Sequence, residues 1–352
     1  MAWQAHWRGW SVALIDRLDV QTSSRVAAGL VTPITGSRAA ASWRWNEFYS
    51  VAEHFYTQVE HATAASIWHV EPALRVFRSE KEKALFENKW IEPRPSADTV
   101  SIRAKSVLHP RTIGWKAPFG MSSMEPAARI DTAAYLSATQ RFFEGRDAFI
   151  KFNLNCDWDI VFDSQNVEYP LTIATLQIAG KRIVFCQGIA ARENSVFNDL
   201  PLHPARGDIL VVLSPNVLID QVIHHDAWVV PFGAGRFVVG ATYDRALLVD
   251  QDEHKQERAK QFRDELMRRW ESLTEGSFLG GQHVVQEQRW AIRPASYDRH
   301  PLIGPHDLHR NVFCLNGLGS KGTLMAPLLA EMLIDAMGGE PIDPALLRSR
   351  RK

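Results

Sequence analysis

The pattern of apolar and polar residues near the C-terminus predicts a strand, a loop and a helix in succession. Residues 311–316 form a short apolar run bounded by turn residues, which is typical of a buried strand. Residues 323–337 have helical composition, and Gly338 and Gly339 follow where glycine commonly ends a helix. The glycine-rich stretch 317–322 therefore lies between a predicted strand and a predicted helix.

Amphipathic stretches elsewhere in the chain predict longer helices. These stretches cover residues 45–64, 79–90, 131–143 and 250–272. Ser79 and Glu82 have the spacing of a capping box, and Asp131 is a typical N-cap residue. The many charges of the last stretch are expected to form a solvated face.

Strand-like runs fill the middle of the chain. These runs cover residues 148–153, 159–162, 171–178, 182–186, 208–213, 217–223, 227–231 and 236–241. Because the middle is antiparallel in character and both ends carry strand–helix elements, we predict an α/β fold that is α+β overall. A Rossmann-like nucleotide-binding domain is expected at residues 1–75, 145–205 and 285–352. An inserted substrate domain with a mixed or antiparallel sheet is expected at 76–144 and 206–284.

Composition argues against several classes of protein. Among 352 residues, 40 basic and 40 acidic residues cancel, which argues against an extended nucleic-acid surface. Cys156, Cys186 and Cys314 are odd in number and widely spaced, so we expect no disulfide framework or zinc site and a reduced, cytoplasmic setting. No apolar run approaches a membrane span. Adjacent His224 and His225 would point to opposite faces of a strand, so we predict no metal site there.

Three glycines of the C-terminal loop have the spacing of a dinucleotide-binding motif. Gly317, Gly319 and Gly322 match G-x-G-x-x-G between a strand and a helix. No second strand ending in an acid follows, so the loop does not open a βαβ unit. It can present backbone N–H groups and a helix N-terminus to an electron-rich ligand. A glycine-rich turn without a ligand is the alternative.

The N-terminal segment resembles the second half of a βαβ unit. Residues 1–7 predict a helix, and residues 11–16 predict a strand that ends at Asp16, where a carboxylate can bind ribose hydroxyls. The glycine motif should lie about 20 residues before such an acid, but only fifteen residues precede Asp16. We therefore expect a first strand and glycine loop upstream of Met1; the alternative is that nucleotide binding of the usual kind has been lost. The small residues of 22–33 suit close approach to a ligand, or an ordinary loop.

Four stretches in this order resemble the D-amino-acid oxidase and glycine oxidase family of flavin enzymes. That group also includes sarcosine oxidases and the oxidase domain of the bacterial tRNA methylaminomethyl-uridine enzyme. The stretches are 12–16, 23–30, 228–231 with 235–242, and 292–295 with 301–305 and 316–324. The resemblance spans residues 1–347 and implies FAD as the cofactor of the nucleotide-binding domain.

The resemblance also implies which residues contact FAD. Asp16 would bind the adenosine ribose, 23–30 would follow the pyrophosphate and flavin, and the loop 317–323 would point its N–H groups at the flavin N1 and O2 edge. Reduced flavin is negative at that edge, so the helix dipole stabilises it. The candidate cofactor-binding residues are Asp16, Ser23, Ser24, Arg25, Ala28, Gly29, Gly188, Gly317, Gly319, Ser320, Lys321, Gly322 and Thr323.

The resemblance implies that two candidate catalytic residues contact the substrate. Arg293 matches an arginine that holds the substrate carboxylate through two parallel hydrogen bonds. Trp228 replaces a substrate-facing tyrosine of glycine oxidases, and Ser320 replaces a second arginine, which counts against simple glycine or D-amino-acid substrates; Lys321 could supply a replacement charge.

The resulting functional prediction is an FAD-dependent oxidase of a C–N bond. It takes a hydride from a small-molecule amine or amino acid and is reoxidised by dioxygen. One alternative is a degenerate, non-catalytic or partner-dependent family member with an exposed sheet edge. The other is an oxidase of a modified tRNA base, against which the neutral charge counts because it makes nucleic acid an unlikely partner.

Overall fold

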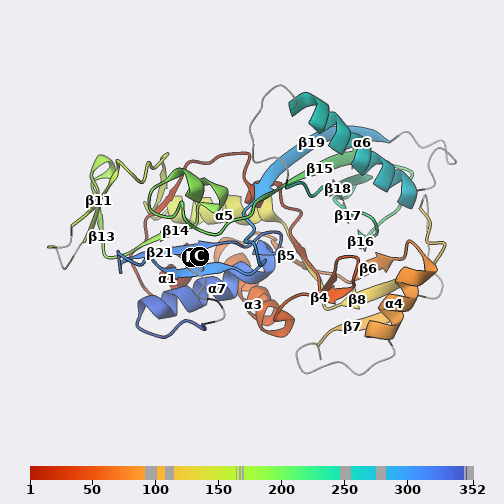
Figure 1. The fold of residues 1–352 in the computed structure, drawn as a ribbon, viewed down its shortest axis with the longest axis horizontal. Helices are drawn as coiled ribbons and strands as arrows, with labels where there is room; N and C mark the ends of the chain where they lie inside the picture. The colour runs from red at the N-terminus through yellow and green to blue at the C-terminus, as the bar shows by residue number, and fades with distance from the viewer. Residues whose placement is uncertain are drawn as a thin grey trace. The chain divides into compact units, whose positions relative to one another are not determined.

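The computed structural model divides into two compact units (Figure 1). It describes residues 1–91, 101–107, 115–163, 165, 168, 170–245, 255–274, 283–344 and 346. Unit 1 consists of Met1–Ser23, Leu136–Ala205 and Ile292–Lys352, and unit 2 consists of Ser24–Tyr135 and Arg206–Ala291. None of the described helices combines the length and the apolar composition needed to cross a bilayer.

The helices agree closely with the sequence predictions. The described α-helices are α1 (Ala2–Trp7), α2 (Ser23–Val26), α3 (Trp45–Thr63), α4 (Glu80–Trp90), α5 (Thr132–Glu144), α6 (Lys255–Leu273) and α7 (Gly322–Met337). Ser79 Oγ accepts the Glu82 N–H at 3.2 Å, and Asp131 Oδ1 accepts the Ala134 N–H at 2.8 Å, so both predicted N-caps are confirmed. The reciprocal half of the predicted capping box is not seen among the described residues, because the Glu82 carboxylate binds Arg75 and Arg78 instead. Residues 250–254 of the predicted helix 250–272 lie outside the described residues.

The strands agree less well. The longer ones are β6 (Ala73–Val76), β7 (Arg103–Ser106), β8 (Met121–Glu125), β15 (Ala205–Leu213), β17 (Trp228–Pro231), β18 (Arg236–Gly240), β19 (Val284–Arg293), β20 (Leu302–Pro305) and β21 (Val312–Asn316). The run 217–223 is wrong as a strand, because β16 (Val222–His224) begins only at Val222. The run 171–178 is interrupted by the 3₁₀ helix η2 (Ala174–Leu176). Sequence analysis missed β19, whose polar composition suits the edge of a sheet.

Unit 1 contains parallel strand pairs of the kind found in nucleotide-binding folds. Strand β1 (Leu14–Asp16) pairs in parallel with β10 (Phe149–Lys151), and β14 (Ile183–Phe185) pairs in parallel with β21. Strand β20 continues the second sheet antiparallel to β21. Among the described residues, β1 and β14 each have one strand partner, so each is a sheet edge.

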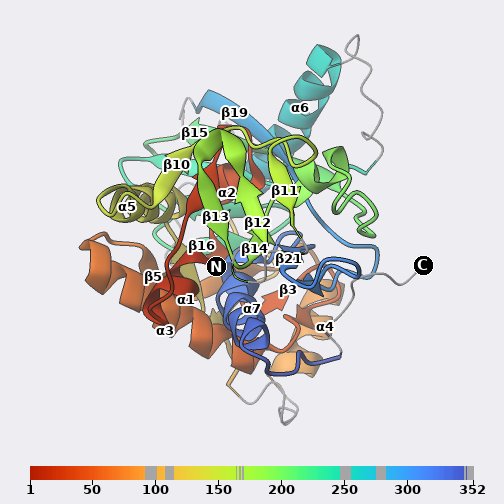
Figure 2. The ribbon, with the colours of Figure 1, turned by 90° about the vertical axis from the view of Figure 1, so that its left-hand side faces the viewer.

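Two further parts of unit 1 flank these sheets. Strands β11 (Ile160–Phe162), β12 (Leu171–Ile173) and β13 (Ile178–Gly180) form an antiparallel meander (Figure 2). Helix α1 packs through Trp3, which is 1% exposed and whose ring lies 4.3 Å from that of Phe142 in α5. Buried aromatic area of this kind dominates the energy of small cores and fixes the helix in place.

Unit 2 is built on an eight-stranded, mainly antiparallel sheet. Its order is β19-β15-β18-β17-β16-β6-β8-β7. Strand β16 pairs with β6 in parallel, whereas the pairs β15–β18, β18–β17, β17–β16, β6–β8 and β8–β7 are antiparallel. Leu210, Val229 and Val239 on one face form a core with Leu266 and Trp270 of α6, which lies along the sheet (Figure 1). The alternation of side chains along each strand leaves the opposite face for other contacts.

A second sheet of unit 2 contains β2 (Leu30–Val31), β9 (Ala128–Ile130) and β5 (Trp68–Val70), all antiparallel. A short pair, β3 (Ile34–Thr35) and β4 (Ala40–Ala41), lies nearby in sequence. Trp68 stacks on Tyr56 of α3 with ring centroids 5.7 Å apart, so one face of the three-stranded sheet is covered by that helix. The assignment of segments to flavin-binding and substrate domains stays a prediction.

Candidate functional site

Asn316 connects the predicted cofactor loop of unit 1 to a distant segment. Its side chain is 3% exposed, and Nδ2 donates to the carbonyl oxygen of Gly188 at 2.8 Å. Its Oδ1 accepts the Gly317 N–H at 2.8 Å. A buried amide is stable only when such bonds are made, so Asn316 holds Gly188 and the loop in one arrangement. Sequence analysis named the two glycines but missed the asparagine that joins them.

The segment after Arg293 lies against the same loop. Gly319 donates its N–H to the Pro294 carbonyl oxygen at 3.2 Å. Ala295 and Leu318 form an isolated antiparallel bridge. The structure of unit 1 therefore brings together the end of β19, the loop 317–322 and the start of the 3₁₀ helix η3 (Gly188–Glu193). Arg293 has intermediate exposure, and its role with a substrate stays a prediction.

The structural reason for glycine differs among the three glycines of the loop. Gly317 has φ +73°, and a Cβ there would lie 2.9 Å from Leu302 Cγ, so local packing excludes a side chain. Gly319 has φ +54°, which also favours glycine. A Cβ at Gly322 would meet only Leu318 side-chain atoms, at an ordinary 3.7 Å. Packing within the described chain therefore does not require glycine at 322. A ligand that approached this position closely would require it.

The N-terminus of α7 offers backbone donors to an electron-rich group. Within the described chain, the N–H groups of Ser320 and Gly322 donate to no protein acceptor. Lys321 is the N-cap residue, makes no side-chain capping bond and is half-buried. Burial lowers the pKa of Lys321 to about 8. These donors and the 16-residue helix dipole fit the electron-rich edge of a flavin.

Asp16 lies at the C-terminal end of β1, as predicted. Its side chain is exposed, and Oδ1 accepts the Leu18 N–H at 2.6 Å in a tight turn. A carboxylate at the carboxyl end of a parallel strand is where dinucleotide folds bind ribose. Ser23 begins α2 a few residues later. The ligand roles of both residues stay predictions.

Packing of the chain explains Gly29 without a ligand. In unit 2, a Cβ at Gly29 would lie 1.9 Å from the Ile130 carbonyl oxygen, and Ile130 N donates to the Gly29 oxygen at 2.9 Å. The neighbouring candidates Ser24 and Arg25 lie in α2, and Ala28 follows that helix. Their contact with the cofactor stays a prediction, and the glycine itself is required by the close approach of β9.

Trp228 lies across a glycine on the sheet of unit 2. It opens β17 and pairs in register with Gly240 of β18. A Cβ on Gly240 would lie 2.4 Å from Trp228 Cζ2 and 2.8 Å from Ile209 Cγ2. The indole therefore rests directly on the backbone of β18 and is partly buried.

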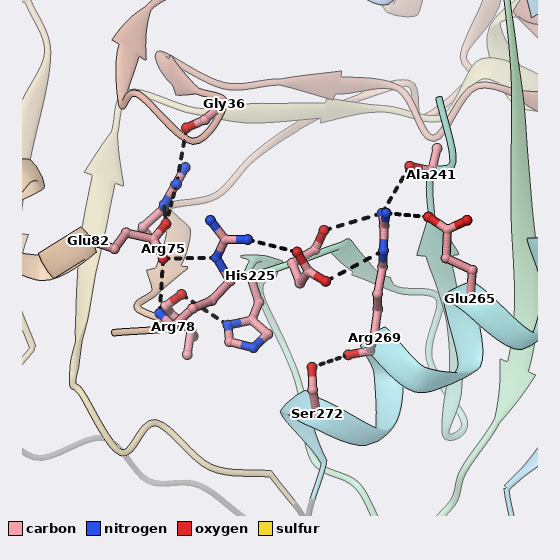
Figure 3. Close-up of polar contacts among 11 residues, drawn as sticks. Gly36, Arg75, Arg78, Glu82, His225, Ala241, Glu265, Arg269 and Ser272 are labelled. Atoms are coloured by element: carbon pink, nitrogen blue, oxygen red, sulfur yellow. Dashed lines mark hydrogen bonds and ion pairs between the residues drawn. The ribbon is translucent and has the colours of Figure 1, made fainter. Parts of the chain in front are cut away.

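An ionic network in unit 2 begins at Arg75. Arg75 is 4% exposed and binds Glu82, which is 8% exposed, and the carbonyl oxygen of Gly36 at 3.1 Å (Figure 3). Arg78 Nε donates to the second oxygen of Glu82 at 3.0 Å. Burial alone would raise the pKa of Glu82, but the hydrogen bonds from Arg75 and Arg78 outweigh it and hold that pKa below its ordinary value.

The network continues to the turn that precedes Trp228. Asp226 accepts from Arg78 at 2.8 Å and lies 3.6 Å from Arg269 of α6 (Figure 3). His225 Nδ1 lies 3.2 Å from the Val76 carbonyl oxygen, and burial lowers the pKa of His225. Residues 225 and 226 are thus held by the end of β6, by Arg78 before α4 and by Arg269 of α6, just before the start of β17. The i,i+4 spacing of Arg78 and Glu82 was the one available sequence signal.

Known structures share the fold. The glycine oxidase of Geobacillus kaustophilus has a TM-score of 0.72 at 16% identity, covering 100% of this chain and 95% of that one. The iminodiacetate oxidase of a Chelativorans species has a TM-score of 0.71 at 16% identity, covering 98% and 95%. The predicted fold class, α/β with a large mixed sheet, is confirmed by these matches.

Curated relatives match the chain over part of their own length. The tRNA 5-methylaminomethyl-2-thiouridine biosynthesis bifunctional protein of Idiomarina loihiensis is 23% identical over 351 residues, covering 95% of this chain and 52% of that protein. The glycine oxidase of Bacillus licheniformis is 30% identical over 146 residues, covering 41% of this chain and 37% of that protein. The chain spans about half, or less, of the length of these relatives.

The sequence profile of one family covers nearly the whole chain. Residues 1–336 match the FAD dependent oxidoreductase family. This match agrees with the resemblance expected from the four stretches and with FAD as the cofactor of the family. The chain therefore belongs to the family of FAD dependent oxidoreductases.

Proposed function

We propose that this chain oxidises a carbon–nitrogen bond of a small amine or amino acid, with FAD as the acceptor and dioxygen as the final oxidant. The observation that carries the proposal is the assembly in unit 1 of Gly188, the segment after Arg293 and the loop 317–322 around Asn316. Family membership supplies the cofactor.

Bound FAD would supply the hydride acceptor, and the protein would supply position and charge. The N–H groups of Ser320 and Gly322 and the N-terminus of α7 would bind the edge that becomes negative on reduction. Arg293 would grip the substrate carboxylate with its planar guanidinium and hold the carbon–hydrogen bond in one orientation. Loss of the hydride from carbon and of the proton from nitrogen would leave an imine, which water hydrolyses to a carbonyl compound and ammonia or an amine.

Trp228 supports a substrate other than glycine. The resemblance puts a hydroxyl-bearing tyrosine at this position in glycine oxidases, whereas an indole offers only one N–H and a large apolar face. The indole packs closely against Gly240 of β18, where a Cβ would lie 2.4 Å from Trp228 Cζ2. We propose that it faces an apolar part of the amine.

A spectrum and an amine screen test the proposal. The full-length protein should show the absorption of bound flavin, and a panel of amines and amino acids should release peroxide with at least one member. Absence of flavin absorption, with no spectral change on adding FAD, would instead favour a degenerate, non-catalytic member of the family.

Oxidation of a modified tRNA base is the second candidate. It is favoured by the relative that covers 95% of this chain and is named for tRNA 5-methylaminomethyl-2-thiouridine biosynthesis. The zero formal net charge counts against it. Binding of tRNA at low salt, followed by loss on raising the salt concentration, would support this candidate, and no binding at low salt would remove it.

A further inference from the structure

Arg269 of α6 contacts the two chain segments that flank the pairing of Trp228 with Gly240. Its Nη1 donates to the carbonyl oxygen of Asp226 and to that of Ala241, each at 3.5 Å (Figure 3). Asp226 lies two residues before Trp228, which opens β17. Ala241 directly follows Gly240, the register partner of Trp228 in β18. One guanidinium nitrogen therefore joins both strand ends beside the indole.

The rest of the same guanidinium is anchored as well. Its Nη2 donates to Glu265, one turn earlier in α6, and its Nε lies 3.6 Å from Asp226 Oδ2. The side chain is 25% exposed, so most of it is withdrawn from water. Hydrogen bonds of 3.5 Å are long and individually weak, but the planar fork of an arginine fixes the direction of all its N–H groups at once. Arg269 therefore defines a geometry more than it adds stability.

The turn that carries Asp226 is too short to absorb a displacement. The N–H of His225 donates to the Ala227 carbonyl oxygen at 2.8 Å, and β17 begins at the next residue, Trp228. Arg78, which lies before α4, donates to the other carboxylate oxygen of Asp226, Oδ1, at 2.8 Å. A shift of Asp226 would therefore pass to Trp228 through two peptide units.

On the β18 side, the indole lies directly against backbone. A Cβ at Gly240 would lie 2.4 Å from Trp228 Cζ2, so the ring occupies the space that a side chain would need. Because Ala241 is the next residue, the hydrogen bond from Arg269 to its carbonyl oxygen holds the backbone on which the ring rests. Both the ring and its support are thus positioned from α6.

We infer that Arg269 is a positioning residue for substrate selection, because it joins Asp226 to Ala241 and so fixes Trp228 against β18. The inference rests on the proposed function for one step, the contact of the indole with the apolar part of the amine. An indole held in one orientation presents a preformed apolar face, whereas a mobile indole must be ordered when the amine binds. Arg269 thereby strengthens the binding of amines whose apolar part fits that face.

Fluorine NMR of the full chain, with FAD present and tryptophan replaced by 5-fluorotryptophan, tests the positioning without turnover. The Trp228 signal is identified by its loss in Trp228→Phe. Arg269→Gln should shift and broaden that signal while circular dichroism shows a folded protein. The matched control is Arg268→Gln, which removes the same charge from the adjacent, exposed position of α6 and should leave the Trp228 signal in place.

A second variant, Arg269→Lys, guards against misfolding. Lysine keeps the positive charge beside Glu265 and Asp226, but its single ammonium group cannot reproduce the planar fork that reaches both carbonyl oxygens. The Trp228 signal of Arg269→Lys should therefore move in the direction seen for Arg269→Gln. A Trp228 signal at the wild-type position in both variants would overturn the inference.

Steady-state kinetics with an amine that releases peroxide test the selection step. Arg269→Gln should raise KM roughly threefold to tenfold, the size of one hydrogen bond, and change kcat much less, because the indole contributes to binding rather than to hydride transfer. In a Trp228→Leu background the same change should leave KM unaltered. An equal rise of KM in both backgrounds would show a merely structural role and overturn the inference. If no amine releases peroxide, the proposed function fails, and the fluorine signal still decides the positioning.

Discussion

Asn316 donates a side-chain hydrogen bond to the Gly188 carbonyl oxygen at 2.8 Å, across 128 residues of sequence. The bond joins the carboxyl end of β21 to the start of η3, and a second bond from the same side chain positions the Gly317 N–H. A single buried amide thus sets the geometry of the loop that we propose for the flavin.

Replacing Asn316 by alanine should destabilise unit 1. The buried Gly317 N–H and the partly buried Gly188 carbonyl oxygen lose their partner, which costs about 1–3 kcal/mol of unfolding free energy. Urea unfolding measures the change. Leu308→Ala, at a residue that is 81% exposed, is the control and should change the unfolding free energy by less than about 0.5 kcal/mol. Equal values for the two variants would show that the Asn316 bonds are unimportant.

Gly322→Ala should separate cofactor binding from stability. The added Cβ has room within the chain and lies at a helical position, so the unfolding free energy should not change. If the loop binds FAD, the added methyl group lies beside the N–H donors and should weaken FAD binding roughly tenfold. Fluorescence titration with FAD measures this affinity. Gly180→Ala in β13, whose Cβ would meet only the Arg182 oxygen at 3.8 Å, is the control. Unchanged FAD affinity in Gly322→Ala would contradict the placement.

Glu82→Gln should lower stability in a pH-dependent way. The folded-state pKa of Glu82 is lowered from 4.5, so its contribution is fully present above the unfolded value and is lost as pH falls through the folded one. Removing one partner of a buried ion pair costs about 3 kcal/mol at pH 7, and the difference from wild type should shrink below about pH 4.

Unfolding titrations between pH 3 and 7 measure that difference. Glu80→Gln, at the exposed first position of α4, is the matched control and should show only a small effect across this range. A difference between wild type and Glu82→Gln that stays constant with pH would rule out the charge of Glu82 as its cause.

Gly240→Ala should strain the contact with Trp228. The new Cβ would overlap the indole at 2.4 Å, and such overpacking costs about 1–3 kcal/mol. In a Trp228→Leu background the same change should cost less, because the overlapping ring atoms are gone. A double-mutant cycle in urea measures the coupling. Strictly additive changes in unfolding free energy would show that the two side chains do not interact.

Local features were predictable because their causes lie within a few residues. The caps of α4 and α5 depend on Ser79 with Glu82 and on Asp131, all within one helical turn. Asp16 ends β1 as the apolar run before it predicted. Strands were harder, since β19 is polar and its pairing with a sheet depends on residues far away in sequence.

The sequence by itself determined the helices, their caps, the family resemblance and the glycine-rich loop between strand and helix. Only the tertiary structure decided that Asn316 reaches Gly188 and that Ile130 explains Gly29. Each of these facts concerns residues that lie about a hundred or more positions apart in the sequence. No local pattern encodes them, because hydrogen-bond satisfaction and close packing depend on the path of the whole chain.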